Sequence, residues 1–306
     1  MRLAVAMPAE SVRERSNCNF PHCPLGTKIN GLFKFSVCIG SLLQLKQLLI
    51  GGILVQFEIL SDIGKKRVVN EDGAAVFTLP GGIILAIIAD GMGGHRGGDF
   101  ASRTAIKIIG EEFIKLKSIE NKQEIVWLEW LKETVYYVNR TLFNYANDNE
   151  EFKGMGTTLD TVLIHGDTCL ISHIGDSRIY SINEEAIRQV TTDHSYVNVL
   201  IDSGEITEEE AAVHPRRNWI MKALGSERTV DPDFISLDLK EEKYLLICTD
   251  GLSNKVDSTT MKNIILSADS LREKTETLVN LANEMGGEDN ISVILLRPSI
   301  EEVSVE

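Results

Sequence analysis

Two apolar segments of the sequence each end in an Asp-Gly pair. Residues 85–89 (LAIIA) directly precede Asp90, and residues 244–248 (YLLIC) end one residue before Asp250. Five apolar residues without Pro or Gly predict a strand buried on both faces, and such a strand delivers the Asp behind it to the edge of a sheet. A single Asp-Gly pair is typical of an ordinary turn. Its repetition after two buried strands favours two carboxylates that converge on one cation.

Further acidic residues lie at predicted strand ends or in Gly-rich turns. The whole set is Glu71, Asp72, Asp90, Asp176, Asp250 and Asp289. Oxygen ligands without a His or Cys set select hard ions, Mg²⁺ or Mn²⁺, over Zn²⁺. Four or more carboxylates would suit two ions about 3.5 to 4 Å apart, an arrangement that stabilises in-line displacement at phosphorus. The expected chemistry is phosphoester hydrolysis. The structural alternative is an Asx-turn or a helix cap, and that role is sufficient for Asp167, Asp193 and Asp202.

Hydrophobic periodicity predicts the elements that position these acids. Strands are expected at 55–61, 74–78, 83–89, 157–165, 168–174, 178–182, 234–239, 244–248 and 291–296, and helices at about 99–117, 124–147 and 270–285. Residues 193–226 are too polar for a core and read as a flap. Helices in two groups, each after hairpin-connected strands, indicate α+β layers rather than a doubly wound α/β sheet.

Charge and cysteine usage limit the classes of partner. The 306 residues carry a formal net charge of -14, although residues 1–54 hold six Lys and Arg against two Asp and Glu. This balance argues against nucleic acid or an anionic membrane as the main partner. The most apolar N-terminal segment, 31–54, contains polar residues that disfavour membrane insertion. Five cysteines without a CxxC pair indicate neither a zinc site nor a disulfide framework, so a reducing, cytoplasmic setting is expected.

Residues 1–54 differ in character from the rest and receive no function. One hypothesis is that they are not native domain sequence and that the product starts near Val55; the alternative is a loosely packed extension. The expected organisation is therefore an N-terminal extension at 1–54, a catalytic domain at 55–298 with a flap at about 193–226, and a tail at 299–306.

Eight short motifs, in order, resemble the bacterial branch of the metal-dependent type 2C Ser/Thr protein phosphatases. They are SDIG at 61–64, RVVNED at 67–72, ADGMGGH at 89–95, GMGTT at 154–158, GDSR at 175–178, TDHS at 192–195, TDGL at 249–252 and EDN at 288–290. The resemblance covers residues 55–297. So many motifs in one order are far more specific than a lone match.

The resemblance implies a four-layer α-β-β-α sandwich of two antiparallel sheets flanked by helices. It also implies roles for individual residues. Asp90 bridges two Mn²⁺ or Mg²⁺ ions, Asp250 and Asp289 complete one of them with Asp72 in its outer shell, and Glu71 and the Gly91 carbonyl serve the other. Asp176, with Asp250, matches the site of a third and weaker ion.

Arg67 corresponds to the arginine that holds the substrate phosphate, a role that also suits a permanent, fork-shaped cation. The alternative is a surface salt bridge with Glu71 or Asp72, and Lys65 and Lys66 are expected only to solvate this loop. The animal members of the family carry a His after the Asp-Gly of the first motif, proposed as general acid, where this chain has Met92. His95 is the nearest candidate for that role, with a structural role as its alternative.

The sequence therefore predicts a protein-serine/threonine phosphatase that hydrolyses phosphoserine and phosphothreonine by direct attack of a water bridging two metal ions. Phosphorylated proteins, including a cognate Ser/Thr kinase, are the expected partners. One rival is a scaffold that keeps the fold and binds phosphoproteins without turnover, disfavoured because every acid is present. The other is a two-metal nuclease, disfavoured by the acidic composition.

Overall fold

Two antiparallel sheets form the centre of the molecule. The computed structural model describes residues 4–6, 47–50, 53–93, 97–116, 124–166 and 168–300. Within these residues, one sheet has the order β1-β4-β5-β7-β8-β11, with the short β6 paired to β5, and the other has the order β10-β9-β12-β13-β3-β2. The first sheet consists of β1 Ala4–Ala6, β4 Asp72–Thr78, β5 Ile84–Met92, β6 Gly156–Thr157, β7 Leu159–His165, β8 Thr168–Ile174 and β11 Asp233–Asp238. The second consists of β2 Gln47–Ile50, β3 Ile53–Asp62, β9 Arg178–Ile182, β10 Ile187–Gln189, β12 Tyr244–Cys248 and β13 Ile291–Ile300.

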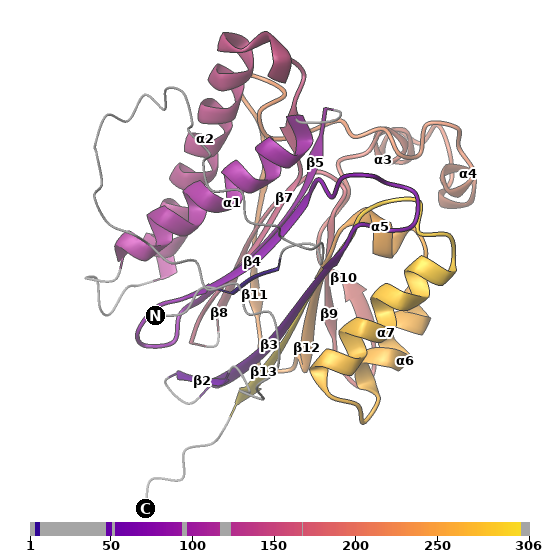
Figure 1. Ribbon diagram of the computed structural model, residues 1–306. Helices are drawn as coiled ribbons and strands as arrows, with labels where there is room; N and C mark the ends of the chain where they lie inside the picture. Colours follow the sequence, from indigo (N-terminus) through magenta and orange to yellow (C-terminus); the bar gives the residue numbers. More distant parts are fainter. Residues whose placement is uncertain are drawn as a thin grey trace, which may run out of the picture.

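Helices cover the outer face of each sheet (Figure 1). Helices α1 (Gly97–Lys115) and α2 (Glu124–Asp148) lie against the first sheet, and α5 (Asp250–Ser253), α6 (Ser258–Leu266) and α7 (Leu271–Glu284) lie against the second. A one-turn 3-10 helix spans Glu150–Phe152, and the short α3 (Tyr196–Asp202) and α4 (Glu208–Ala212) lie in the expected flap, beyond one end of the sheets. The result is the four-layer α-β-β-α sandwich expected from the sequence.

The side chains of strand β5 contribute to two of the three hydrophobic cores. Its side chains alternate between the faces of the sheet, as the period of two requires. Leu85 and Ile87 enter the core between the first sheet and α1 and α2, whereas Ile84 and Ile88 enter the core between the two sheets. A third core lies between the second sheet and α5 to α7. Because both faces of β5 are covered, its apolar run is continuous, which is why it was recognisable from the sequence.

Most predicted elements are confirmed within one to three residues, and the differences have local causes. The strand expected at 157–165 is divided into β6 and β7 at Thr158. Helix α6 and strand β10 were not predicted: α6 has only nine residues and β10 three, too short for a clear period. Helix α7 begins with a capping box in which Ser270 accepts from the Glu273 backbone N–H and Glu273 accepts from the Ser270 backbone N–H.

Two short segments of the expected N-terminal extension pair with the sheets. Strand β1 pairs with β4, and β2 pairs with β3, both antiparallel. At the other end of the chain, β13 continues to Ile300, two residues beyond the expected end of the catalytic domain. The division into extension, catalytic domain and tail stays a prediction.

Candidate metal-binding site

Acidic residues from both sheets meet at one end of the sandwich. Strand β4 starts at Asp72, which lies directly opposite Asp90 near the end of β5. In the other sheet, β12 ends just before Thr249, whose hydroxyl donates a hydrogen bond of 2.9 Å to Asp72 Oδ2. Because this bond joins the end of one sheet to the start of a strand in the other, Asp72, Asp90 and the neighbouring Asp250 are brought to a common region.

Electrostatics shows that these acids interact. Burial, and then repulsion by Asp72, Asp250, Asp176 and Asp289, raises the pKa of Asp90 well above its ordinary value. Burial is also the main cause that raises the pKa of Asp72 to about 7, of Asp176 to about 8 and of Asp250 to about 6. Each of these three carboxyls is further repelled by at least one other acid of the group. A bound cation would remove this repulsion.

Several oxygen atoms of the group suit a cation. The buried oxygens Asp72 Oδ1, Asp176 Oδ1 and Asp250 Oδ1 accept no hydrogen bond from the described residues. Glu71 and Gly91 also converge: a Cβ atom added to Gly98 would lie 2.7 Å from both Glu71 Oε1 and the Gly91 carbonyl oxygen. Unsatisfied buried carboxylate oxygens are costly unless a cation or a donor compensates them. The donor set, all oxygen, fits Mg²⁺ or Mn²⁺.

The acidic side chains of the described residues do not by themselves form a complete coordination shell for a metal ion. Among the described residues, no group of three His, Cys, Asp or Glu side chains is arranged to hold one metal ion. Asp289 is bound elsewhere: its Oδ2 accepts a 2.8 Å hydrogen bond from Arg67, and its Oδ1 accepts one from the Asn290 backbone N–H. Mg²⁺ commonly takes one or two carboxylates and completes its shell with water, so pairs of these oxygens are sufficient for its binding.

Arg67 therefore forms the surface ion pair that was its structural alternative, although with Asp289 rather than Glu71 or Asp72. Its side chain is 47% exposed and that of Asp289 35% exposed. An exposed pair of this kind contributes only about 0 to 1 kcal/mol, so Arg67 can exchange Asp289 for another anion.

Asn290 organises the loops of the site, a role that the sequence analysis did not assign. Its Oδ1 accepts from the Glu71 backbone N–H at 2.8 Å, and its Nδ2 donates to the carbonyls of Ile63 and Val69 at 2.9 and 3.0 Å. The side chain is 3% exposed. Its place directly after Asp289, in a turn before a strand, was the available signal.

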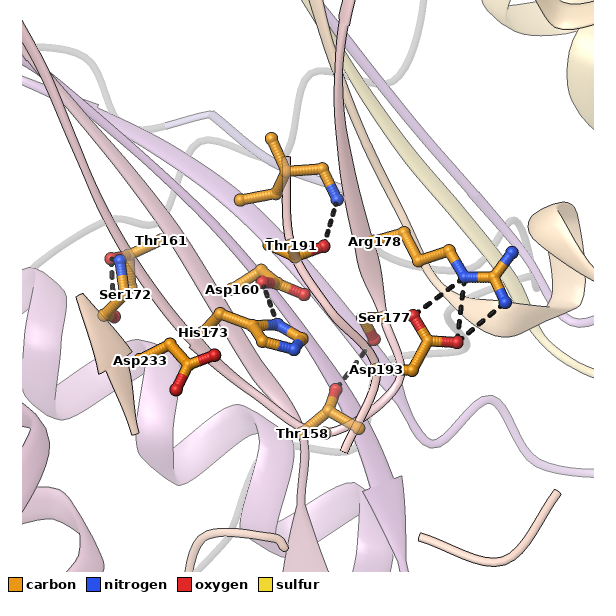
Figure 2. Close-up of polar contacts among 12 residues, drawn as sticks. Thr158, Asp160, Thr161, Ser172, His173, Ser177, Arg178, Thr191, Asp193 and Asp233 are labelled. Carbon is orange, nitrogen blue, oxygen red and sulfur yellow. Dashed lines mark hydrogen bonds and ion pairs between the residues drawn. The ribbon is translucent and has the colours of Figure 1, made fainter. Parts of the chain in front are cut away.

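Thr158 fixes the backbone of Asp90. Its hydroxyl accepts from the Asp90 N–H at 2.8 Å and its own N–H donates to the Asp90 carbonyl at 2.8 Å. The hydroxyl also bonds to Ser177 at 2.8 Å, next to Asp176 (Figure 2). Thr158, which lies between β6 and β7, thus connects the segment that carries Asp90 to the segment that carries Asp176.

The first residues of the flap are bound to the turn that carries Asp176 (Figure 2). Arg178 donates to both carboxylate oxygens of Asp193, at distances of 2.7 to 3.0 Å. On the other side of Asp176, the backbone N–H of His194 donates to the Gly175 carbonyl at 2.7 Å, and Nδ1 of His194 accepts from the Gly175 N–H. Asp193, whose sequence suggested only a cap or turn, therefore anchors the flap.

A fully buried pair, His173 and Asp160, lies beside the start of the flap. His173 Nδ1 is 2.8 Å from Asp160 Oδ1 (Figure 2). Its Nε2 is 3.0 Å from the Thr192 carbonyl oxygen. Because Nε2 must carry a proton to bond that carbonyl, one further proton is shared between Nδ1 and the Asp160 carboxyl group. The pair ties β7 and β8 to the residue before the flap.

One histidine and two cysteines are the remaining side chains with a candidate chemical role. His95, the candidate general acid, lies outside the described residues. Cys169 and Cys248 are free and fully buried, and burial raises the pKa of both thiols, which disfavours either as a nucleophile. None of the described helices combines the length and the apolar composition that a membrane crossing requires.

Comparison with known proteins identifies the family. The model of the family described as Protein phosphatase 2C matches residues 64–294. The serine/threonine phosphatase stp of Listeria monocytogenes is 38% identical over 239 residues, which cover 78% of this chain and 94% of that protein. Stp1 from Staphylococcus aureus has a solved structure that matches with a TM-score of 0.75 and 32% identity, over 85% of this chain and 98% of that one. The catalytic domain of the phosphatase PstP, solved with two manganese ions, matches with a TM-score of 0.67 and 31% identity, over 80% of this chain and 99% of that one.

The fold and the cluster of Asp72, Asp90, Asp176 and Asp250 define a sandwich protein with a candidate cation site, and the comparisons specify its family. The chain belongs to the protein phosphatase 2C family. This confirms the resemblance seen in the sequence and the enzyme class that it implies, a protein-serine/threonine phosphatase.

Proposed function

We propose that this protein hydrolyses phosphoserine and phosphothreonine in phosphoproteins with the help of two Mn²⁺ or Mg²⁺ ions. The observation that carries the proposal is the cluster of buried acids from both sheets, with carboxylate oxygens that accept no hydrogen bond from the described residues. The PstP domain bound to two manganese ions supports the same number of ions here.

In this proposal the oxygen ligands would serve two ions, with Asp90 bridging them. Glu71 and the Gly91 carbonyl, which converge beside Gly98, would hold one ion, and Asp250 and Asp289 would hold the other with Asp72 behind them. Asp176, repelled by Asp250, would share a third and weaker ion with it. When bound, such ions lower the pKa of water to give a hydroxide at neutral pH and offset charge on the phosphoryl oxygens.

Arg67 would bind the substrate phosphate. It already holds an anionic partner, Asp289, at 2.8 Å, so its guanidinium lies at the edge of the acid cluster. A guanidinium binds phosphate with two parallel hydrogen bonds and cannot lose its charge near neutral pH. Exchange of Asp289 for phosphate would also free that carboxylate for a cation, which would couple substrate binding to the metal site.

The direct test is hydrolysis of p-nitrophenyl phosphate and of a phosphothreonine peptide, with and without Mn²⁺. Asp90→Asn and Asp250→Asn are each expected to reduce kcat by at least 100-fold, the scale on which loss of transition-state charge stabilisation acts. Asp238→Asn is the matched control, because Asp238 pairs with Thr168 at the opposite end of β8 from Asp176.

Two results would overturn the proposal. One is hydrolysis that persists in EDTA, and the other is full activity of Asp90→Asn. Stable binding of phosphopeptides without any turnover would favour the non-catalytic scaffold instead. The physiological setting is a further part of the proposal: phosphoproteins of the cytoplasm, with a cognate Ser/Thr kinase among them.

A further inference from the structure

A basic loop stands at the edge of the acid cluster. Residues 64–69, here called the rim loop, join β3 of one sheet to β4 of the other, and they include Lys65, Lys66, Arg67 and Val68. All four of these side chains are exposed. In a chain of net charge -14, three consecutive exposed cations next to the proposed active site are a local reversal of the general charge.

The rim loop is held firmly, although the sequence suggested only a solvated turn. The backbone N–H groups of Lys65 and Lys66 both donate to the Gly287 carbonyl, at 2.7 and 3.1 Å. Asn290 binds the carbonyls at both ends of the loop, and Gly64 adopts a φ of 80° in direct contact with the Asp289 carbonyl. A Cβ atom at Gly64 would lie 2.1 Å from that oxygen, so the glycine is required for this approach.

Two of the three cations form no ion pair within the described residues, although Lys66 adds to the effect of Lys255 in lowering the pKa of the nearby Glu288. Arg67 binds Asp289, and the nearby Lys255 binds Glu288. For Lys65 and Lys66, by contrast, the described residues form no ion pair within 4.0 Å. A fixed backbone that presents two ammonium groups without an ion pair is suited to an external anion, because less conformational entropy is lost on binding.

We propose that the rim loop selects substrates, and that Lys65 and Lys66 bind acidic residues flanking the phosphorylated residue of a phosphoprotein. This inference rests on the proposed function, since it needs the phosphate to lie at Arg67. The two lysines directly precede Arg67, so an extended segment whose phosphate binds Arg67 passes the lysines with its neighbouring side chains. Val68, which is 87% exposed, supplies an apolar contact on the same loop.

Charge complementarity argues for an acidic segment rather than a basic one. The protein as a whole carries an excess of acidic residues, so attraction at this loop directs an acidic segment to the site. Two exposed ion pairs together change an equilibrium about fivefold. The effect is expected in kcat/KM, which reports encounter with substrate, more than in kcat.

The test uses three phosphothreonine peptides of equal length whose flanking residues are acidic, neutral or basic. The readout is the ratio of kcat/KM for the acidic peptide to that for the neutral peptide, measured with Mn²⁺. The wild-type protein is expected to prefer the acidic peptide about fivefold, and the Lys65→Ala/Lys66→Ala double variant to bring the ratio close to one. Lys65→Glu/Lys66→Glu is expected to reverse the preference toward the basic peptide.

The matched control is Lys240→Glu/Lys243→Glu. These lysines precede β12, at the opposite end of this strand from Asp250, and their exchange alters the net charge equally. The control is expected to keep the wild-type ratio, and thermal unfolding checks that all variants are folded. In 0.5 M salt the wild-type ratio should fall, because the Debye length drops to about 4 Å.

A wild-type ratio of one, or a ratio that the Lys65 and Lys66 variants leave unchanged, would overturn the inference. Failure of the proposed function is recognised separately, as the absence of p-nitrophenyl phosphate hydrolysis. In that event, peptide affinity measured by fluorescence anisotropy with the same phosphopeptides, now labelled, still tests the role of the rim loop in peptide binding. Equal affinity of the wild-type protein for the acidic and neutral peptides would refute this role. A preference for the acidic peptide that disappears in the Lys65→Ala/Lys66→Ala variant would support it.

Discussion

Replacement of Asp72 by Asn is expected to stabilise the metal-free protein at pH 7.5. Asp72 is 5% exposed, and burial, followed by repulsion from Asp250 and Asp289, raises the pKa of its carboxyl group from 3.8 to about 7. A carboxyl with a raised pKa binds its proton more tightly in the folded state. Its folded form is therefore favoured at low pH, and that stability is lost as the pH rises from about 4 through 7.

The magnitude follows from the shift. About three pKa units at 1.36 kcal/mol each give a ceiling of about 4 kcal/mol near pH 7.5. Since a neighbouring acid can take up a proton and relieve the same repulsion, about 2 kcal/mol is the more realistic gain. For a domain of this size this corresponds to a rise in Tm of about 4 to 8 °C. An Asn side chain can still accept the 2.9 Å hydrogen bond from Thr249 through its carbonyl oxygen.

The assay is thermal unfolding of both proteins in EDTA at pH 5.0 and 7.5, and in Mn²⁺ at pH 7.5. The advantage of the Asn variant should fall to less than half at pH 5.0, where the carboxyl of the wild-type protein is already protonated in the folded state. With Mn²⁺ the order should reverse, because the variant has lost one charge that favours cation binding. A variant that is less stable than wild type in EDTA at both pH values would show that repulsion within the acid cluster does not limit the stability of the metal-free protein.

Three further predictions concern stability away from the acid cluster. Asp160→Ala should lower the free energy of unfolding by about 3 kcal/mol in urea titration, because it leaves His173 buried without its partner. Asp160→Asn, whose amide can donate to Nδ1 of His173, should lower the free energy of unfolding clearly less. Equal losses in the two variants would contradict the shared-proton arrangement. Gly110→Ala should lower the free energy of unfolding by about 1 to 3 kcal/mol, since the added Cβ would lie 2.2 Å from the Phe77 ring. Unchanged stability would mean that the ring moves freely. Ser270→Ala should cost about 1 kcal/mol through loss of the α7 cap, measured by the same titration, and Ser270→Asp, which can accept the same bond, should restore it.

The amino-acid sequence determined the elements whose neighbours lie close along the chain. Continuous apolar runs such as that of β5 and the helical period of α1 and α2 are local patterns, because burial on both faces or on one stripe is written into consecutive residues. The acids at the ends of such runs were therefore identified as a set. Short elements such as β10 and α6 carry too few residues for a period, and only their packing on the second sheet reveals them.

The tertiary structure alone decided how the loops around the acids are joined. Asn290 binds Ile63 and Val69, more than 220 positions away, and Thr249 binds Asp72 across the two sheets. Nothing in the local sequence encodes such pairs, because a side-chain hydrogen bond depends on the approach of segments that the chain separates. The same reason explains why Lys65 and Lys66 read as a solvated turn in the sequence but stand on a fixed loop in the folded protein.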